Sequence, residues 1–536
     1  MNTFIKLLKY ISLCIIPLFF SCKDSEEVLK QLYFVDNTLP AEDLSAKGGT
    51  FSFEVEWAYT QWRVLSGAVI KGQQFIENIS PGIAGSVEGK FSQTTVNVDF
   101  KANSTHEINS QELILASLDG KFREEIVLSQ SPLGFEPFDL IIDPVKTYQT
   151  ITGFGGANMI WGSDYLSTAE MELAFGTDDG LGLSILRVRL SSNKSDWAGL
   201  VSVIKNANAR GVKVLASPWS PPAAWKSNNS TNGGGYLLPE RYGDFAGYIN
   251  EFITYMSTNG AVVDVVSIQN EPDWKVNYEG CEYTIPQMYN FVKNNAGSVT
   301  AAKVLAAESL NFKHTYTDDI LNDPVAVNNI DIVGFHIYGS GKQSYPLAVQ
   351  KGKEVWMTEH LYNLNSGNIP GNWTDQTNPE IIWDETMTML TDINDGMAFN
   401  WNAYIWWYIR RYYSFLGDGE RGTSRGTILK RGYAMSQYSK FIRPGYVRID
   451  AEFDFAIDGI KVTAYKGDES IVAVIINTTG YNDYKVNLMA PSVVTSAVSY
   501  TTSLSLNRNK EILTPIDKNI LINIPAKSIT TVVFAQ

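Results

Sequence analysis

Two glutamates stand out, because each follows a short apolar run where a strand is expected to end. Glu271 closes the sequence Ser-Ile-Gln-Asn-Glu, and Glu359 closes Val-Trp-Met-Thr-Glu. Two carboxyl groups that flank one bond can cleave it, since one protonates the leaving oxygen while the other attacks or activates water. This chemistry suits a glycosidic bond, and Asn270 is placed to hydrogen-bond a sugar 2-hydroxyl. A rim glutamate can also form an ordinary salt bridge, so the pair must share one cleft.

The elements that would position these glutamates alternate between apolar strands and amphipathic helices. Helices are predicted over 196–210 and 239–260, where apolar residues recur at helical spacing. Strands are predicted at 151–155, 184–189, 212–217, 262–269, 303–307, 331–337, 354–359 and 403–408. Eight βα units fit an α/β fold of the (β/α)₈ TIM-barrel type, whose chemistry lies at the carboxyl ends of its strands. Both glutamates are therefore expected at the barrel mouth.

Other side chains are expected near the same strand ends. Arg187 and Tyr338 could each donate a hydrogen bond to Glu359 and keep it ionised. His336 lies on the same predicted strand as Tyr338, and a structural layer inside the barrel is the alternative for all three supporting residues. Indole rings just after strand ends can stack on sugars or merely pack against loops, and these are Trp161, Trp219, Trp225 and Trp274.

The composition excludes several functional classes. Of 536 residues, 44% are apolar and 19% charged, which indicates packed globular domains. The net charge of −14 opposes binding to nucleic acid or to an anionic membrane surface. Three cysteines are too few for a disulfide scaffold, and no metal-ligand spacing or phosphate loop occurs. We therefore expect no metal, no cofactor and no nucleic-acid partner, and we expect a monomer.

The stretch from about 138 to 536 resembles family-30 glycoside hydrolases, and most closely their bacterial glucuronoxylanase subfamily, subfamily 8. Seven motifs carry the resemblance in order, at 153–156, 185–188, 217–222, 269–273, 356–359, 404–411 and 430–433. The resemblance implies a retaining endo-β-1,4-xylanase in which Glu271 is the general acid/base and Glu359 the nucleophile. The acid role requires a raised pKa for Glu271, and a retaining mechanism requires carboxyl groups about 5–5.5 Å apart.

An acidic sugar branch is implied by the residues after the last barrel strand. In the family, the residues matching Arg411, Trp407, Tyr408 and Tyr413 hold the methylglucuronate branch of xylan. A guanidinium suits this task, because its planar fork matches a carboxylate. The sequence departs from the family pattern at two places, so the dependence on uronate could be relaxed. Tyr362 or Ser366 would have to replace a tyrosine and a serine that contact the uronate in the family. The loop 414–426 is longer than the family's loop and carries extra glycines and charges.

The flanking segments predict a surface protein. Residues 1–22 resemble a bacterial lipoprotein signal ending at Cys22, followed by acidic residues typical of display outside the outer membrane; an ordinary secretory signal is the alternative. Residues 30–133 alternate with period 2 and resemble a BACON module, an immunoglobulin-like β-sandwich that is either a spacer or a glycan binder. Residues 446–536 predict a side β-sandwich, to which 138–150 is expected to add a strand; the barrel then spans 138–445.

These observations predict an enzyme that hydrolyses glucuronoxylan at the cell surface and contacts the membrane only through a lipid on Cys22. Two alternatives remain. One keeps the chemistry on another β-glucan or a decorated xylan without uronate dependence. The other is a surface glycan-binding protein whose barrel is inactive, which the intact glutamate pair disfavours.

Overall fold

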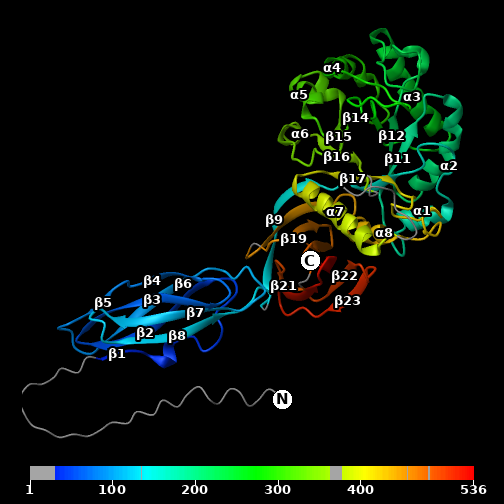
Figure 1. Ribbon diagram of the computed structural model, residues 1–536. Helices are drawn as coiled ribbons and strands as arrows, with labels where there is room; N and C mark the ends of the chain where they lie inside the picture. Colours follow the sequence, from blue (N-terminus) through cyan, green and yellow to red (C-terminus); the bar gives the residue numbers. More distant parts are fainter. Residues whose placement is uncertain (1–30, 135, 363–376, 456, 481–482, 536) are drawn as a thin grey trace, which may run out of the picture. The chain divides into compact units, whose positions relative to one another are not determined.

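The computed structural model describes residues 31–134, 136–362, 377–455, 457–480 and 483–535 (Figure 1). The chain divides into two compact units, Met1–Glu136 and Pro137–Gln536, which are considered separately below. Across the described residues, every helix is too short or too polar to cross a membrane. The predicted signal and Cys22 lie outside the described residues, as does Ser366.

The N-terminal unit is all-β, as the alternation predicts. One sheet has the order β1-β2-β6-β4 and the other β5-β3-β7-β8. Alternate residues such as Phe53 and Val55 point into the core between the sheets, while Trp57 is only half-buried. Gly120 has the positive φ of the turn that joins β7 to β8. The strands are Gln31–Phe34, Gly49–Ala58, Thr60–Lys71, Ile76–Ser80, Ala84–Ser86, Ser92–Phe100, Asn109–Ser117 and Arg123–Gln130 (β1 to β8).

The second unit contains a closed barrel of eight strands in the order β10 to β17, so the predicted (β/α)₈ barrel is confirmed. Each strand pairs in parallel with its neighbours, and β17 returns to β10. Apolar side chains such as Leu215 and Trp356 fill the interior. The strands are Gly153–Ala157, Ile185–Leu190, Lys213–Pro218, Val265–Ser267, Lys303–Ser309, Ile332–His336, Glu354–Glu359 and Ala403–Tyr408 (β10 to β17).

Helices surround the barrel with their apolar stripes turned inward. In α3 the buried residues include Phe245, Ile249 and Phe252, and the helix starts later than predicted because Pro239–Arg241 forms a 3₁₀ turn. The helices α1 to α8 are Thr168–Phe175, Trp197–Asn208, Tyr242–Thr258, Ile285–Asn294, Asp318–Asn322, Pro346–Gln350, Pro379–Ala398 and Lys430–Ser439. Short 3₁₀ helices are Asp36–Thr38, Lys194–Asp196, Ala223–Trp225, Pro239–Arg241, Ala296–Ser298, His314–Tyr316 and Ala326–Asn329.

The C-terminal β-domain is one continuous sheet of nine strands that curls around its own core. The order is β23-β22-β25-β20-β19-β18-β9-β21-β24, with β9 (Phe138–Thr150) between β18 and β21. Leu140, Leu513 and Ile520 come from distant strands of this order yet share one hydrophobic cluster. The remaining strands are Val447–Phe453, Ile460–Lys466, Ser470–Asn477, Tyr484–Met489, Ala497–Ser503, Asn509–Leu513, Asn519–Ile524 and Ser528–Ala535 (β18 to β25).

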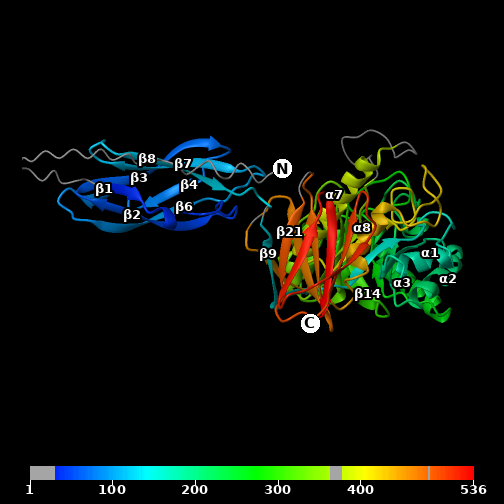
Figure 2. The same ribbon diagram turned by 90° about the horizontal axis from the view of Figure 1, so that it is seen from below.

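The barrel and this β-domain form one packed body. Side chains of β19, β20 and β25, including Tyr465, Val474 and Ile529, belong to the same hydrophobic cluster as the barrel helices. Helices α7 and α8 contact the sheet directly (Figure 2). The β-domain therefore supports the barrel from the side of β17, which carries part of the cleft described next.

Candidate active site

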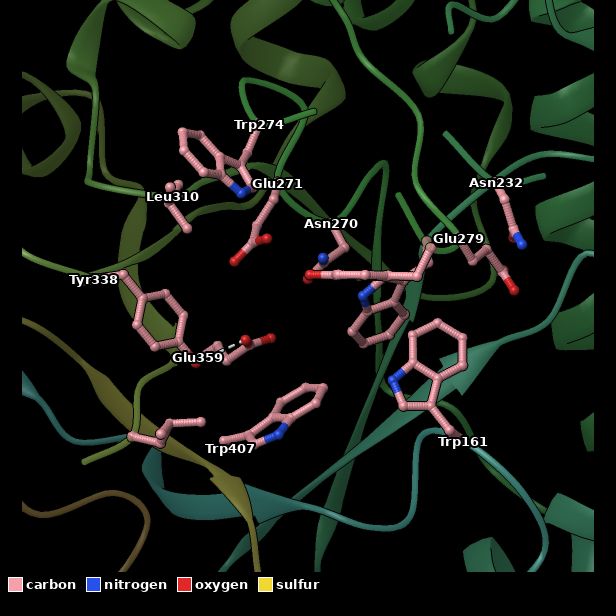
Figure 3. Close-up of a pocket in the computed structure, with 13 residues that line it drawn as sticks. Trp161, Asn232, Asn270, Glu271, Trp274, Glu279, Leu310, Tyr338, Glu359 and Trp407 are labelled. Atoms are coloured by element: carbon pink, nitrogen blue, oxygen red, sulfur yellow. Dashed lines mark hydrogen bonds between the residues drawn. The ribbon is translucent and has the colours of Figure 1, made fainter. Parts of the chain in front are cut away.

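A cleft of about 870 Å³ opens where the barrel strands end (Figure 3). Its lining comes from the carboxyl ends of the strands and the loops that follow them, as barrel chemistry requires. The lining residues are Trp161, Trp219, Asn232, Asn270, Glu271, Trp274, Tyr278, Glu279, Leu310, Tyr338, Glu359, Leu361 and Trp407. Both predicted glutamates thus share one hollow with several aromatic rings.

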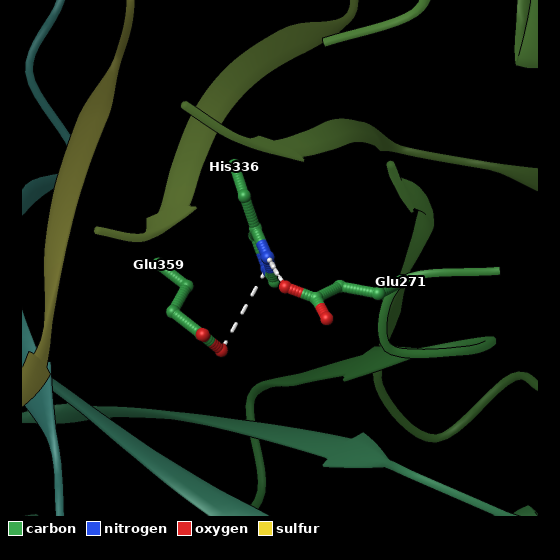
Figure 4. Close-up of side chains that lie close together, drawn as sticks. All are labelled: Glu271, His336 and Glu359. Carbon is green, nitrogen blue, oxygen red and sulfur yellow. Dashed lines mark hydrogen bonds and ion pairs between the residues drawn. The ribbon is translucent and has the colours of Figure 1, made fainter. Parts of the chain in front are cut away.

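The two glutamates face each other across this cleft with His336 between them (Figure 4). One carboxylate oxygen of Glu271, one of Glu359 and a ring nitrogen of His336 all lie within 4.8 Å of one another. The His336 ring bonds Glu271 Oε1 through Nδ1 at 2.9 Å, and its Nε2 lies 3.9 Å from Glu359 Oε2. One bond can therefore be reached by both carboxyl groups.

Glu271 is placed by a turn in an unfavourable backbone conformation. Its φ is +46°, which is uncommon for a residue with a side chain. Its backbone N–H donates to the carbonyl of Glu308 at 3.1 Å, which fixes the turn to the next strand. Burial raises the pKa of Glu271, and the negative charge of Glu359 raises it further, against the lowering effect of His336. These effects favour a protonated carboxyl group.

Glu359 ends β16 and receives two strong hydrogen bonds. Arg187 Nη1 donates to its Oε2 at 2.5 Å, and the Tyr338 hydroxyl donates to its Oε1 at 2.8 Å. Both donors were expected from their strand positions. Charge-assisted bonds of this kind stabilise the ionised carboxylate and fix its orientation.

Glu308 is a buried member of this network that the sequence analysis missed. It lies in β14, fully buried, and its Oε1 accepts from Arg187 Nη2 at 3.0 Å and lies 3.7 Å from His336 Nε2. Burial alone would raise the pKa of Glu308, but the charge of Arg187 and the His336 ring lower it to about 2. The predicted strand 303–307 ends two residues before β14 does, and so it leaves out Glu308, an acid near a strand end like Glu271 and Glu359.

His336 is charged in this setting. Burial alone would lower its pKa, but the charge of Glu359 and the hydrogen bond to Glu271 raise the pKa of His336 to about 9. The cations Arg187 and His336 thus lie among the carboxyl groups of Glu271, Glu308 and Glu359. The same carboxylates would also suit a cation, but the guanidinium already bound to Glu359 repels one.

Aromatic rings form the walls beside the pair. Trp219 lies 5.7 Å from Trp161 and 6.0 Å from Trp407 between ring centroids, and the Arg187 guanidinium lies 4.9 Å from the Trp219 ring. Asn270 Oδ1 accepts from Arg187 Nη2 at 2.7 Å, and Asn270 lines the cleft, where its amide N–H groups can donate to a ligand. Flat apolar faces beside polar groups suit a sugar ring.

Four predicted substrate-binding residues lie outside the cleft lining. Trp225 packs edge-on against Tyr248 at 5.8 Å between centroids, because the 3₁₀ turn after β12 directs its ring toward α3. Trp225 is therefore not placed to stack on a sugar in this cleft. Tyr408 and Tyr413 are buried behind Trp407, and the Arg411 guanidinium lies 5.2 Å from the Tyr408 ring.

Arg411 and Tyr362, which were expected to contact the uronate, contact acidic side chains in this structure. The side chain of Arg411 is 31% exposed, and its Nη1 lies 3.7 Å from Asp418 Oδ2, an acid supplied by the long loop 414–426. The Tyr362 hydroxyl donates to Asp392 at 2.7 Å.

Five further loop residues line the cleft and were not predicted: Asn232, Tyr278, Glu279, Leu310 and Leu361. Their sequence context carries no strand or helix pattern that would have revealed them.

Comparison of the sequence and the structure with known proteins shows the family of this chain. The chain is 38% identical over 409 residues to the glucuronoxylanase XynC of Bacillus subtilis (strain 168), covering 74% of this chain and 91% of the relative. A family-30 subfamily 8 xylanase structure from Clostridium acetobutylicum has 34% identity and a TM-score of 0.66, and a family-30 endoxylanase structure from Clostridium papyrosolvens has 35% and 0.64. Both comparisons cover 74% of this chain and all of the other.

A sequence profile described as glycosyl hydrolase family 59 also matches residues 193–443, a part of the barrel region. The matches to XynC and to the two family-30 structures each cover 74% of this chain, a larger share than the profile match covers. On this basis, the chain belongs to glycoside hydrolase family 30.

Proposed function

We propose that this chain is a retaining endo-β-1,4-xylanase that cleaves glucuronoxylan. The observation that carries the proposal is the approach of Glu271 and Glu359 to within 4.8 Å between carboxylate oxygens. Inverting glycosidases separate their carboxyl groups by about 6.5–9.5 Å to admit a water, whereas retaining enzymes keep them about 5–5.5 Å apart. The xylanase activity named for the relatives supports the choice of xylan.

In the first step, Glu359 attacks the anomeric carbon while Glu271 protonates the leaving oxygen. Arg187 and Tyr338 hold Glu359 in the attacking orientation, and the burial of Glu271 keeps its proton available. A glycosyl ester then joins the sugar to Glu359. Glu271 is ionised after it has given its proton to the leaving oxygen, and neutralisation of Glu359 removes one cause of its raised pKa, which favours this ionised state. Glu271 then takes a proton from the water that attacks the anomeric carbon, and the ester bond breaks to release the sugar and the Glu359 carboxylate.

The uronate branch is proposed to bind beside Trp407, against Arg411, Tyr408 and Tyr413. In a chain of net charge −14, a local guanidinium is needed to attract an anion. Arg411 is partly exposed, and the ion pair that it would have to release is the long 3.7 Å contact with Asp418. Asp418 competes with the uronate for the same guanidinium, so the preference for acidic branches is proposed to be moderate.

The contact between Arg411 and Asp418 also favours a second candidate, a family-30 β-glycosidase on a glycan without uronate. If Asp418 permanently neutralises Arg411, the cleft beyond the catalytic pair selects neutral sugars only. The chemistry at Glu271 and Glu359 is the same in both candidates.

The test measures reducing-end release and product sizes from glucuronoxylan and from undecorated xylan. The proposal expects cleavage by the wild type, none by Glu359→Gln, and larger, branch-spaced products from glucuronoxylan. Arg411→Ala should lower kcat/KM several-fold on glucuronoxylan only, and Asp418→Asn should raise it. Equal fragmentation of both xylans by the wild type and by Arg411→Ala would favour the second candidate. Release of no sugar from either xylan would reject xylanase activity.

We also propose that the protein is a monomer anchored in the outer membrane through a lipid on Cys22 and exposed at the cell surface. The support is the sequence pattern of residues 1–22 and the acidic residues that follow. The N-terminal β-module is then a spacer between the membrane and the enzyme. Radioactive palmitate should label the wild type and not Cys22→Ser.

A further inference from the structure

One wall of the cleft is made by two loops that pair with each other. Asn232 forms an isolated antiparallel bridge with Glu279, and the N–H of Gly233 donates to the carbonyl of Tyr278 at 3.0 Å. The buried ammonium of Lys226 donates to the carbonyl of Gly280 and so ties the loops together from behind. This wall is therefore a built surface rather than a loose loop.

Glu279 belongs to this wall, and one of its carboxylate oxygens accepts no hydrogen bond from the described residues. Only 8% of the residue is exposed. Its Oε2 accepts from Arg189 Nη2, but its Oε1 is buried and has no hydrogen-bond partner among the residues that the structure describes. Arg189 Nε is likewise buried without a partner in the described part of the chain.

An unpaired buried acceptor beside a charge is costly, and a ligand that donates a hydrogen bond removes the cost. Glu279 lines the cleft, and Figure 3 places it with Asn232 on the side away from Tyr338. Trp161 lies in the same part of the cleft, because its ring is 4.8 Å from the Arg189 guanidinium that binds Glu279 and is edge-on to Trp219. A sugar stacked on Trp161 would bring its hydroxyl groups to Glu279.

We propose that Glu279, held by Arg189, binds a free hydroxyl group of the sugar unit next to Trp161 and makes this position selective for an unsubstituted sugar. The proposal rests on the proposed function in that it takes the ligand to be a xylan chain. It adds a rule for where substituents are tolerated, which the catalytic pair and Arg411 do not provide.

The selectivity follows from the state of the Glu279 oxygen. A xylose unit with free hydroxyl groups supplies the missing O–H donor. A unit acylated or glycosylated at that hydroxyl has no hydrogen to donate, and it would leave a buried carboxylate oxygen unpaired. A site built to bind a hydroxyl group rejects an analogue that lacks it far more strongly than an apolar pocket rejects an extra methylene.

The experiment maps acetyl groups on the products released from acetylated xylan. In wild-type products we expect one position, at a fixed distance from the cleaved bond, to be free of acetyl groups. Glu279→Ala should admit acetylated units at that position and lower kcat/KM on linear xylo-oligosaccharides about tenfold, the loss of one hydrogen bond to a charged group. Glu279→Gln, which keeps an acceptor and the side-chain size, should retain part of the selectivity.

Glu282→Gln is the matched control, because Glu282 lies on the same loop, accepts from the Gly235 N–H and does not line the cleft. A purely structural role for Glu279 would lower the rate on all xylans equally and leave the acetyl pattern unchanged, which would overturn the proposal. If the wild type cleaves no xylan, the proposed function fails by itself. In that case, the β-glycan that the wild type does cleave is acetylated, and the same variants are tested on it. The acetyl pattern of the products then decides the role of Glu279.

Discussion

Replacing Glu308 by glutamine tests the buried charge network beneath the catalytic pair. Glu308 lies against Arg187 and His336 and touches no position that a substrate would occupy. Glutamine has nearly the shape of a protonated glutamate, so the substitution imitates protonation of this one carboxyl group. The expected loss of stability can therefore be calculated from the pKa of Glu308.

The ordinary pKa of a glutamate is 4.5, and that of Glu308 is lowered to about 2. At about 1.36 kcal/mol for each pH unit between these values, ionised Glu308 stabilises the fold by about 3 kcal/mol. A lowered pKa means that this contribution is fully present above pH 4.5 and is lost as the pH falls through about 2. The figure agrees with the roughly 3–5 kcal/mol lost when one partner of a buried ion pair is removed.

The assay compares urea unfolding of the wild type and Glu308→Gln between pH 7 and pH 3, followed by tryptophan fluorescence. The difference between the two proteins cancels the contribution of carboxylates that lie outside this network. It should be about 3 kcal/mol at pH 7 and should shrink steadily below pH 4.5. A variant as stable as the wild type at pH 7, or a difference that does not change with pH, would refute the charge network.

Three further outcomes follow from the same geometry. Tyr338→Phe removes the hydroxyl bound to Glu359 and should lower kcat/KM between about tenfold and 150-fold, the equivalent of about 1.5–3 kcal/mol; a change under twofold would contradict the contact. The pKa of His336 is raised to about 9, so its charge stabilises the fold fully below pH 6.5, and this stabilisation is lost as the pH rises through 9. Between pH 6.5 and pH 9, the melting temperature of the wild type should therefore fall more than the melting temperature of His336→Asn. Trp161→Ala should raise KM on xylan by about tenfold through the loss of stacking area, whereas Trp225→Phe should leave KM unchanged; equal effects of the two would contradict the assignment of the cleft.

The barrel was predictable because its signals are local. Each strand is a short apolar run and each helix has a regular apolar stripe, so their alternation indicates the fold without knowledge of any contact. The strand ends then locate Glu271 and Glu359, since all parallel strands of a barrel present their carboxyl ends on one face. Tyr338, just beyond the end of β15, follows from the same rule, whereas Arg187 lies within β11 and reaches Glu359 from the buried barrel interior.

The orientation of single side chains was less predictable. Trp225 and Trp219 both follow the same strand, yet a 3₁₀ turn directs Trp225 toward α3 while Trp219 lines the cleft. Glu308 was missed because its strand extends beyond the apolar run, into a residue with φ of +52°. Such a turn depends on neighbouring strands, which the local sequence does not describe.

The sequence by itself determined the order of strands and helices, the family resemblance and the two acids at strand ends, because propensity and hydrophobic periodicity act over a few residues. Only the tertiary structure decided which charges meet: Arg187, Glu308 and His336 come from three different strands, and closure of the barrel brings them together beneath the cleft. The same holds for Glu279, whose unused oxygen exists only because two loops pair and bury it. Burial and charge pairing are properties of the folded arrangement, and they set the protonation of the site.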